Sequence, residues 1–408
     1  MTTQRRRFLR LCGAVGVGTL AGCSTTSTDT PTGNEGTATA EQPPDPTPQW
    51  NRTYGTGDGN HALFAAVDGV DGGHFFAGGS TSATGGDSFD EWVLKLDSAG
   101  EQAWERVPTD DEGTNVLTTA TAVSDGYVVG GFSTDEGTVY DARMRKFGAD
   151  GTDEWDRTFE RRQGWTVLPG IDDGYLLAGT TIERNPDAWI QTVDSDGNER
   201  WSATVDDGDR EVVFGGEAVG DGYVFAGYSS ADSGPRGYLL DVDTDGSKRW
   251  SELVTGEEQA ELKDVVAVEG GYIAAGVTYV GVENDGTAAD DGLVVKVDEG
   301  GSVQWSRTVA ERDGGRFESI VASDGSLYAV GEYGTGDARD GWVVELDSSG
   351  EELASTTYGT DSYDTLDDVT RTADGAYLLS GETARSAPGQ SEGWGIKVID
   401  PVAGVPDE

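Results

Sequence analysis

Three residues in the middle of the chain combine side chains that could hold a ligand by charge and stacking. Arg161, Arg162 and Trp165 place two guanidinium groups beside an indole, in a chain with 28 Lys and Arg against 75 Asp and Glu. Guanidinium groups pair with anionic groups, and indoles stack on flat ligands. The trio therefore predicts a site for an anionic or sugar-like ligand. The alternative is a solvated pair of arginines beside a packing tryptophan.

Patterns typical of catalysis or of a resident metal are sparse. His61 and His74 are the only histidines, and neither has metal-site spacing. The chain has no Gly-x-Ser-x-Gly elbow and no phosphate-binding glycine loop. A carboxylate pair for glycoside hydrolysis could be drawn from many residues, but the spacing singles out none. We therefore assign no catalytic residue and no metal ligand.

Two turns resemble fragments of calcium-binding loops. They are Asp194-Ser195-Asp196-Gly197-Asn198 and Asp243-Thr244-Asp245-Gly246. Both lack the later glycine and glutamate spacing of an EF-hand, and hairpin geometry demands the same residue types. We therefore predict no cofactor, with weak surface calcium binding as the remaining option.

The N-terminus carries the marks of an export signal and a lipid anchor. Arg5-Arg6 resembles a twin-arginine signal, and the apolar stretch Leu11–Leu20 is too short to span a bilayer. The stretch ends in Leu20-Ala21-Gly22-Cys23, which is similar to a lipobox, so residues 1–22 are expected to be cleaved and Cys23 to carry a diacylglyceryl group. An ordinary signal peptide with a coincidental cysteine is the alternative. The protein is thus expected on the outer face of the cell membrane.

Residues 23–48 are predicted to be a disordered tether that starts at the lipidated Cys23. They are rich in Ser, Thr and Pro and have no hydrophobic periodicity. Such a segment cannot bury enough apolar surface to offset the entropy lost on ordering.

The charge of the chain is extreme, with a formal net value of -47. Carboxylates spread over the whole sequence keep a surface hydrated in concentrated salt, where their mutual repulsion is screened. The composition resembles that of proteins from halophilic archaea. The alternative is that the acidity attracts cations or basic partners. Nucleic acid is excluded as a partner because no basic stripe exists to release its counterions.

Two repeated marks predict blades of four strands. An acidic-glycine turn before an apolar run, as in Asp125-Gly126 and Asp221-Gly222, occurs seven times if looser copies such as Gly270-Gly271 are included. Asp-Gly between apolar runs predicts a hairpin. A second turn of the form Asp-x-x-Gly precedes a tryptophan in most units, as in Asp97–Trp104, whereas a degenerate copy ends at Leu353. These intervals are typical of propeller blades.

The ends of the repeat region predict a closed ring. Trp50–Tyr54 reads as a fourth strand without a blade before it, and the last unit stops at Lys397–Asp400 without a fourth strand. Together they complete one blade, giving an all-β, seven-bladed β-propeller over residues 49–402, with a tail at 403–408. Closure removes exposed sheet edges, whereas the alternative, an open solenoid, leaves them uncapped. The first strand also holds a glycosylation sequon, Asn51-Arg52-Thr53.

The Asp-x-x-Gly-x-x-x-Trp pattern resembles the tryptophan-docking motif of pyrroloquinoline-quinone-type (quinoprotein-like) propellers. The resemblance implies that the tryptophans pack between neighbouring blades; they are Trp50, Trp104, Trp155, Trp201, Trp250 and Trp305. Quinone-dependent dehydrogenases of that superfamily carry adjacent cysteines, a calcium ion and usually eight blades. The two cysteines here are Cys12 and Cys23, which are not adjacent, so the resemblance favours relatives that bind or scaffold.

Loop lengths predict the face that binds a partner. The connections between second and third strands and those between blades are expected to be long and variable, for example Ser80–Asp90, Ser229–Arg236, Thr278–Asp291 and Ser386–Glu392. Long loops on a rigid scaffold commonly carry recognition. We therefore expect a monomeric, non-catalytic module that binds a cell-envelope protein or a glycan. The alternative is an extracytoplasmic quinone-dependent oxidoreductase or hydrolase that uses the central funnel.

Overall fold

The computed structural model describes residues 49–55, 59–81, 88–107, 113–135, 139–171, 173–231, 234–254, 259–282, 288–309, 314–335, 338–360, 362–384 and 390–402. The predicted signal peptide, Cys23, the tether and the C-terminal tail lie outside these residues. Every regular element described is a β-strand. In this part of the chain no helix is long and apolar enough to cross a membrane.

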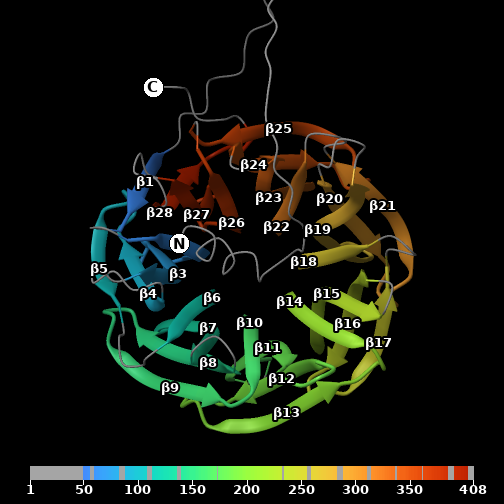
Figure 1. Cartoon of the computed structure of the whole chain (residues 1–408). Coiled ribbons are helices and arrows are strands. Elements are labelled where there is room, and N and C mark those ends of the chain that lie inside the picture. Colours follow the sequence, from blue (N-terminus) through green and yellow to red (C-terminus); the bar gives the residue numbers. More distant parts are fainter. Residues whose placement is uncertain are drawn as a thin grey trace, which may run out of the picture.

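Seven antiparallel sheets of four strands stand around a common axis (Figure 1). The first three are β2 (His61–Asp68), β3 (His74–Thr81), β4 (Phe89–Leu96), β5 (Gln102–Arg106); β6 (Thr114–Val123), β7 (Gly126–Asp135), β8 (Val139–Gly148), β9 (Asp153–Phe159); and β10 (Arg162–Pro169), β11 (Tyr175–Thr181), β12 (Ala188–Val193), β13 (Glu199–Val205). The next two are β14 (Arg210–Val219), β15 (Gly222–Ala231), β16 (Gly234–Asp243), β17 (Lys248–Leu253); and β18 (Ala260–Val268), β19 (Gly271–Val282), β20 (Ala288–Val297), β21 (Val303–Val309). The last two are β22 (Gly315–Ser323), β23 (Ser326–Thr335), β24 (Ala338–Leu346), β25 (Glu352–Tyr358); and β26 (Asp364–Arg371), β27 (Tyr377–Ala384), β28 (Ser391–Val398) with β1 (Trp50–Tyr54). The predicted seven-bladed β-propeller is confirmed.

The ring closes where the sequence predicts it. β1 pairs antiparallel with β28 from Trp50 opposite Lys397 to Tyr54 opposite Gly393. The indole N–H of Trp394 donates to the side-chain oxygen of Asn51 at 2.6 Å, so the sequon asparagine also takes part in the closure. The first and last strands that the structure describes therefore share one blade.

The core lies between the blades. The two middle strands of a blade are almost wholly buried, as in β11 and β12, whereas the outer strand β13 is buried only at its end. One cluster joins Leu176 and Ile190 of one blade to Val213 and Phe225 of the next. Each sheet therefore buries both faces against its neighbours, which fits the continuous apolar runs of its middle strands.

Six tryptophans of the outer strands lie against glycines in the Asp-x-x-Gly turn of the next blade. A Cβ added to Gly151 would lie 2.9 Å from the ring of Trp104, and the pairs Trp50–Gly100, Trp155–Gly197, Trp201–Gly246, Trp250–Gly301 and Trp305–Gly350 are equivalent. The indole N–H of Trp104 also donates to the backbone oxygen of Ala149 at 3.1 Å. Leu353, at the degenerate position, is 57% exposed.

One expectation about loop length is wrong. β15 and β16 pair as far as Ala231 opposite Gly234, so Ser229–Arg236 is a hairpin and not a long loop. Gly234 adopts φ +102°, which lets the chain reverse within a short turn. β19 and β20 likewise stay paired to Val282 opposite Ala288, well inside the stretch Thr278–Asp291. The strands continue past the blade core because their backbone N–H and C=O groups hydrogen-bond to one another.

Candidate functional site

The two faces of the propeller carry different kinds of connection between strands. We call the face with the blade-to-blade connections and the connections between second and third strands the loop face; the Asp-Gly hairpins lie on the other. Inner strands begin at the loop face and end at the Asp-Gly hairpins.

Every inner strand contains a β-bulge at the same place. The pairing of β14 with β15, for example, skips Phe214 between Val213 and Gly215. The skipped residues form what we call the axis ring: Phe64, Thr118, Trp165, Phe214, Lys263, Glu318 and Asp367. A bulge re-aims the side chain of its extra residue, so seven equivalent positions face the axis together. The inner strands that carry them surround the axis in Figure 1.

Three neighbouring pairs of the axis ring touch. The hydroxyl of Thr118 donates to the backbone oxygen of Trp165 at 3.2 Å, and the rings of Trp165 and Phe214 lie edge to face with centroids 5.3 Å apart. The ammonium of Lys263 lies 4.1 Å from the centroid of Phe214. Blades one to four therefore contribute an aromatic and hydroxyl half, and blades five to seven a charged half.

Polar side chains that follow the bulges tie the inner strands to one another. A carboxylate oxygen of Asp264 accepts the backbone N–H of Ile320 in the next blade at 3.1 Å, and Asp368 accepts that of Ala66 at 2.9 Å. Ser319 stands between these carboxylates, 3.1 Å from Asp264 and 3.0 Å from Asp368. Burial raises the pKa of Asp264 to about 7.

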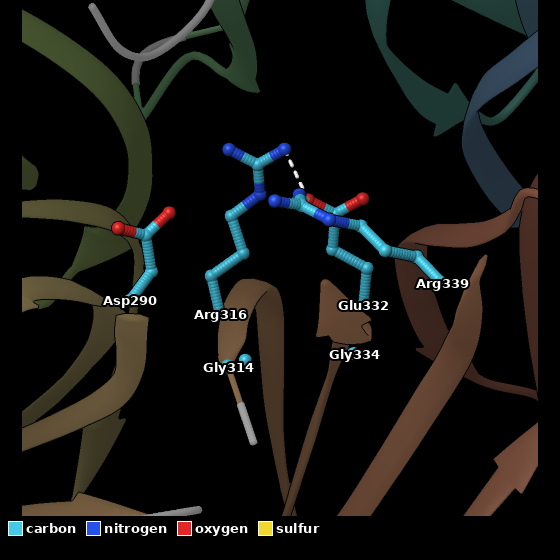
Figure 2. A pocket seen from close by; sticks show the side chains of 7 residues that line it. Asp290, Gly314, Arg316, Glu332, Gly334 and Arg339 are labelled. Carbon is cyan, nitrogen blue, oxygen red and sulfur yellow. Dashed lines mark hydrogen bonds and ion pairs between the residues drawn. The ribbon is translucent and has the colours of Figure 1, made fainter. Parts of the chain in front are cut away.

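Two arginines share one carboxylate on the charged side of the loop face. Arg316 and Arg339 both pair with Oε1 of Glu332, and the hydroxyl of Tyr363 donates to the other oxygen at 3.1 Å. Figure 2 shows Arg316, Glu332 and Arg339 together with Asp290 of the neighbouring blade. Asp290, Arg316, Glu332 and Arg339 line a small depression here. The two guanidinium charges are thus partly neutralised within the protein.

Two further carboxylates on the same side, Glu382 and Asp367, are also enclosed by the fold. Glu382 is 4% exposed, and Asp367 is half-buried. Burial, opposed by a hydrogen bond from Ser391, raises the pKa of Glu382 to about 7. Burial and then the nearby charge of Glu382 raise the pKa of Asp367 well above its ordinary value. Within the residues that the structure describes, no lysine or arginine forms an ion pair with either one.

The two arginines and the tryptophan singled out from the sequence contact different parts of the structure. Trp165 joins the axis ring, between Phe132 and Phe214. Arg161 has φ +56°, and its guanidinium donates to the backbone oxygen of Ile182 at 2.8 Å. Arg162 lies over the ring of Trp189, 5.8 Å from its centroid. No contact among the described residues joins either arginine to Trp165, so a joint site of the three remains a prediction.

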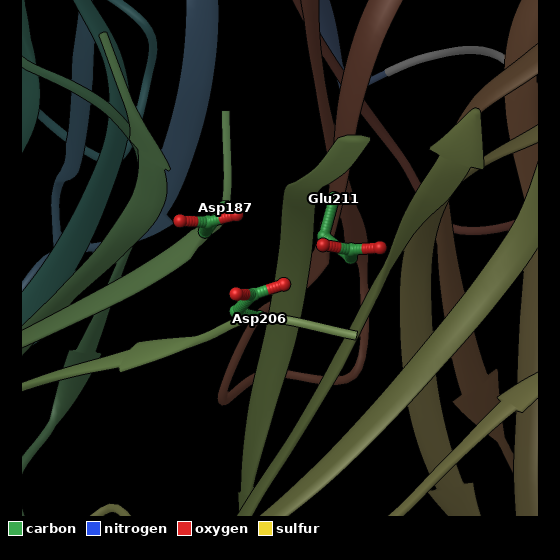
Figure 3. Close-up of side chains that lie close together, drawn as sticks. All are labelled: Asp187, Asp206 and Glu211. Carbon is green, nitrogen blue, oxygen red and sulfur yellow. The ribbon is translucent and has the colours of Figure 1, made fainter. Parts of the chain in front are cut away.

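One group of carboxylates has the spacing of a metal site. Asp187, Asp206 and Glu211 bring ligand oxygens within 4.8 Å of one another on the loop face between two blades (Figure 3). Oε1 of Glu211 already accepts hydrogen bonds from Ser229 and from the backbone of Asp209, both at 3.2 Å. Burial raises the pKa of both Asp187 and Glu211. These residues could hold a calcium ion, although the site is partly satisfied without one.

The turns that resemble calcium loops use their aspartates internally. Oδ1 of Asp194 accepts the backbone N–H of Asp196 at 3.0 Å and of Asn198 at 2.8 Å. Asp243 accepts that of Ser247 at 2.9 Å in the equivalent turn. Side-chain acceptors of this kind hold tight turns.

No family model matches the chain, and no curated protein matches it. Among solved structures, the chain is similar to the propeller of Dos1 (12% identity, TM-score 0.49, covering 82% of each chain). It is also similar to Sqt1 from Chaetomium thermophilum bound to the N-terminus of ribosomal protein L10 (14%, 0.46, 81% of this chain and 86% of that one) and to the phage phi92 endosialidase (10%, 0.49, 87% and 69%). Likeness at this level says nothing about what the chain binds.

Proposed function

We propose that the protein is a non-catalytic binding module, anchored outside the cytoplasm, that takes a protein or glycan partner on its loop face. The axis ring carries this proposal. The positions just before the bulges hold mostly apolar packing residues, such as Leu63, Leu262 and Leu366, all fully buried. The bulge positions instead hold aromatic, hydroxyl, ammonium and carboxylate groups. Packing alone would favour similar side chains in every blade, so the variety points to recognition.

The test compares capture of partners by matched variants. The folded domain is immobilised in concentrated salt and exposed to cell-envelope extract, and the retained component is purified and its binding titrated. We expect saturable binding to the wild type, and a loss of it in Phe214→Ala and Trp165→Ala. The control Leu353→Ala removes an exposed apolar side chain from β25, on the outer rim, and should bind normally. Equal binding by all variants would contradict the proposal.

A second candidate, hydrolysis at the axis, is favoured by one observation. Burial raises the pKa of Glu382 to about 7, which suits a general acid, and the charge of Glu382 in turn raises the pKa of the nearby Asp367. Turnover of chromogenic glycosides that is lost in Glu382→Gln would establish it. Quinone chemistry is checked by adding calcium and pyrroloquinoline quinone, because a bound quinone would give its absorbance and reduce a dye. The proposal of a non-catalytic binding module predicts that neither activity is detected.

The location rests on the N-terminal residues, which lie outside the described part of the chain. We propose that Cys23 carries two acyl chains, which give durable anchoring where one gives marginal binding. In the native host, Cys23→Ser should move the protein from the membrane fraction to the soluble or secreted fraction, as measured by fractionation and immunoblot. Cys12→Ser is the matched control and should leave it at the membrane. Unchanged fractionation of Cys23→Ser would refute lipid anchoring.

A further inference from the structure

The outer strand of the closing blade, β1, holds the single Asn-x-Ser/Thr sequence of the chain, Asn51-Arg52-Thr53. Successive side chains of a strand point to opposite faces, so Asn51 and Thr53 share one face of β1. Both are exposed, whereas Trp50 and Tyr54 are buried in the core. The two side chains that define the sequon are therefore exposed side by side on the folded protein.

The place of β1 in its sheet makes the sequon accessible from outside the ring. The order of strands is β1, β28, β27 and β26, so β1 is the outermost strand. Among the strands that the structure describes, only β28 pairs with it. Figure 1 shows β1 at the periphery of the ring, away from the axis. A large enzyme can therefore contact Asn51 without entering the centre of the propeller.

The fold fixes which end of the Asn51 amide is available. The indole N–H of Trp394 donates to Oδ1 of Asn51 at 2.6 Å. Because an indole N–H can only donate, it must face Oδ1 and not Nδ2. Nδ2 is thus the end of the amide that is turned away from Trp394, and no described residue accepts a hydrogen bond from it.

The same indole contact occurs in two other blades with different acceptors. Trp92 donates to a carboxylate oxygen of Glu105 at 2.7 Å, and Trp189 donates to the hydroxyl of Ser202 at 2.9 Å. Each acceptor directly follows the docking tryptophan of its outer strand, as Asn51 does. Holding the indole therefore requires only an oxygen, and among these three blades the closing blade alone adds an amide nitrogen.

We infer that Asn51 is an N-glycosylation site that carries a glycan on the outer rim of the closing blade. In the transfer, Nδ2 attacks the anomeric carbon of an oligosaccharide linked to a lipid phosphate. The new N–C bond forms as the bond from that carbon to the phosphate oxygen breaks. The lipid phosphate leaves with the electron pair, and one proton of Nδ2 passes to a base of the transferase.

The closed ring is compatible with this product. The transfer leaves Oδ1 of Asn51 unchanged, so the hydrogen bond from Trp394 is retained. The glycan would also cover the outer edge of β1, where unpaired backbone groups invite association with another strand. The inference rests on the proposed location outside the cytoplasm, since sequons of this kind are modified in exported proteins.

The test uses the full-length protein purified from the membrane fraction of the native host. Cleavage before aspartate releases residues 45–57, which contain one asparagine, and mass spectrometry measures this peptide. We expect the wild-type peptide to be heavier by a whole number of sugar residues, with fragmentation placing the increment on Asn51. Thr53→Ser keeps the sequon and should keep the increment, whereas Thr53→Ala should lose it.

Asn51→Ser is the matched control, because it retains a hydroxyl acceptor for Trp394, as Ser202 does for Trp189. It should lose the increment. Produced in a host without N-glycosylation and measured in concentrated salt, it should melt at about the same temperature as the wild type, so its loss cannot be attributed to misfolding. A wild-type peptide of unmodified mass, or an increment that persists in both Thr53→Ala and Asn51→Ser, would overturn the inference.

The glycan and the location fail in different ways. If Asn51 is unmodified in membrane-fraction protein while Cys23→Ser still releases the protein, the glycan is wrong and the location stands. If the chain is found only in the cytoplasm with Asn51 unmodified, both are wrong. Binding at the loop face is tested separately by Phe214→Ala and depends on neither result.

Discussion

At the scale of single residues, two partly buried carboxyls of the inner strands share one hydroxyl. Ser319 contacts Asp264 and Asp368 at 3.1 and 3.0 Å, yet a hydroxyl has one hydrogen and can donate to only one of them. The second contact is favourable when that carboxyl keeps a proton and donates to Ser319. Burial raises the pKa of both aspartates, that of Asp264 to about 7, which agrees with one shared proton.

This arrangement predicts a pH dependence of stability. The native state retains a proton on Asp264 that the unfolded chain has lost between its ordinary pKa of 3.8 and about 7. The free energy of unfolding should therefore fall as pH rises through that window. Asp264→Asn cannot titrate and should show a shallower fall, measured by urea unfolding at constant salt. Glu199→Gln, an exposed carboxylate on β13, is the control. Identical slopes in the wild type and Asp264→Asn would rule out the assignment.

At the scale of elements, the contact between a tryptophan and the glycine of the next blade joins neighbouring sheets. Gly151 has φ +79° and no room for a methyl group, because the ring of Trp104 would lie 2.9 Å away. Gly72 has nearly the same backbone, with φ +82°, but nothing lies within 4 Å of an added Cβ. Alanine substitutions at these two glycines therefore separate two free-energy costs: that of a left-handed backbone with a Cβ, and that of disturbing the contact with the tryptophan.

We predict that Gly72→Ala destabilises the fold by about 1–2 kcal/mol, the cost of a left-handed residue with a Cβ. Gly151→Ala should lose roughly 1–3 kcal/mol more, because the tryptophan must move. Midpoints and slopes of urea unfolding measure both. Equal losses would mean that the inter-blade contact contributes little.

At the scale of the whole molecule, ring closure depends on a strand of five residues. Trp50 and Tyr54 are 7% and 9% exposed, and both belong to the core cluster of the first blade. A chain that starts at Gln49 should unfold at the same temperature as the longer one. A chain that starts at Gly55 loses the buried tryptophan, worth roughly 3–5 kcal/mol, and exposes an edge of β28. It should melt earlier and associate with rising concentration, as seen by calorimetry and light scattering. Equal melting of both chains would show that closure is dispensable.

The net charge of -47 makes a second prediction at this scale. Repulsion among carboxylates is screened over about 10 Å at 0.1 M salt and about 3 Å at 1 M. The melting temperature should therefore rise steadily with potassium chloride, by more than that of a propeller of low net charge measured beside it. A melting temperature that does not change with salt would contradict the interpretation of the acidic surface as a salt adaptation.

The sequence by itself determined the architecture, because the signals of a propeller are local and repeat in every blade. Asp-Gly turns set the hairpins, apolar runs set the buried strands, and the strand Trp50–Tyr54 without a blade implied closure. Each signal depends on backbone conformation within a few residues, and seven copies reinforce it. The overestimated loop at Ser229–Arg236 shows the limit, since polar residues in a paired hairpin resemble a loop.

Only the tertiary structure decided the site. Trp165 could be suspected from its type, but its neighbours in the axis ring, such as Phe214 and Asp367, come from blades far apart in the chain. They meet because each inner strand bulges at one position, at a nearly constant distance before its turn glycine. An alignment of the seven repeats on that glycine would have placed the bulge residues in one column. The register shift that turns those side chains to the axis arises from pairing between strands, and their charges interact only once the ring is closed.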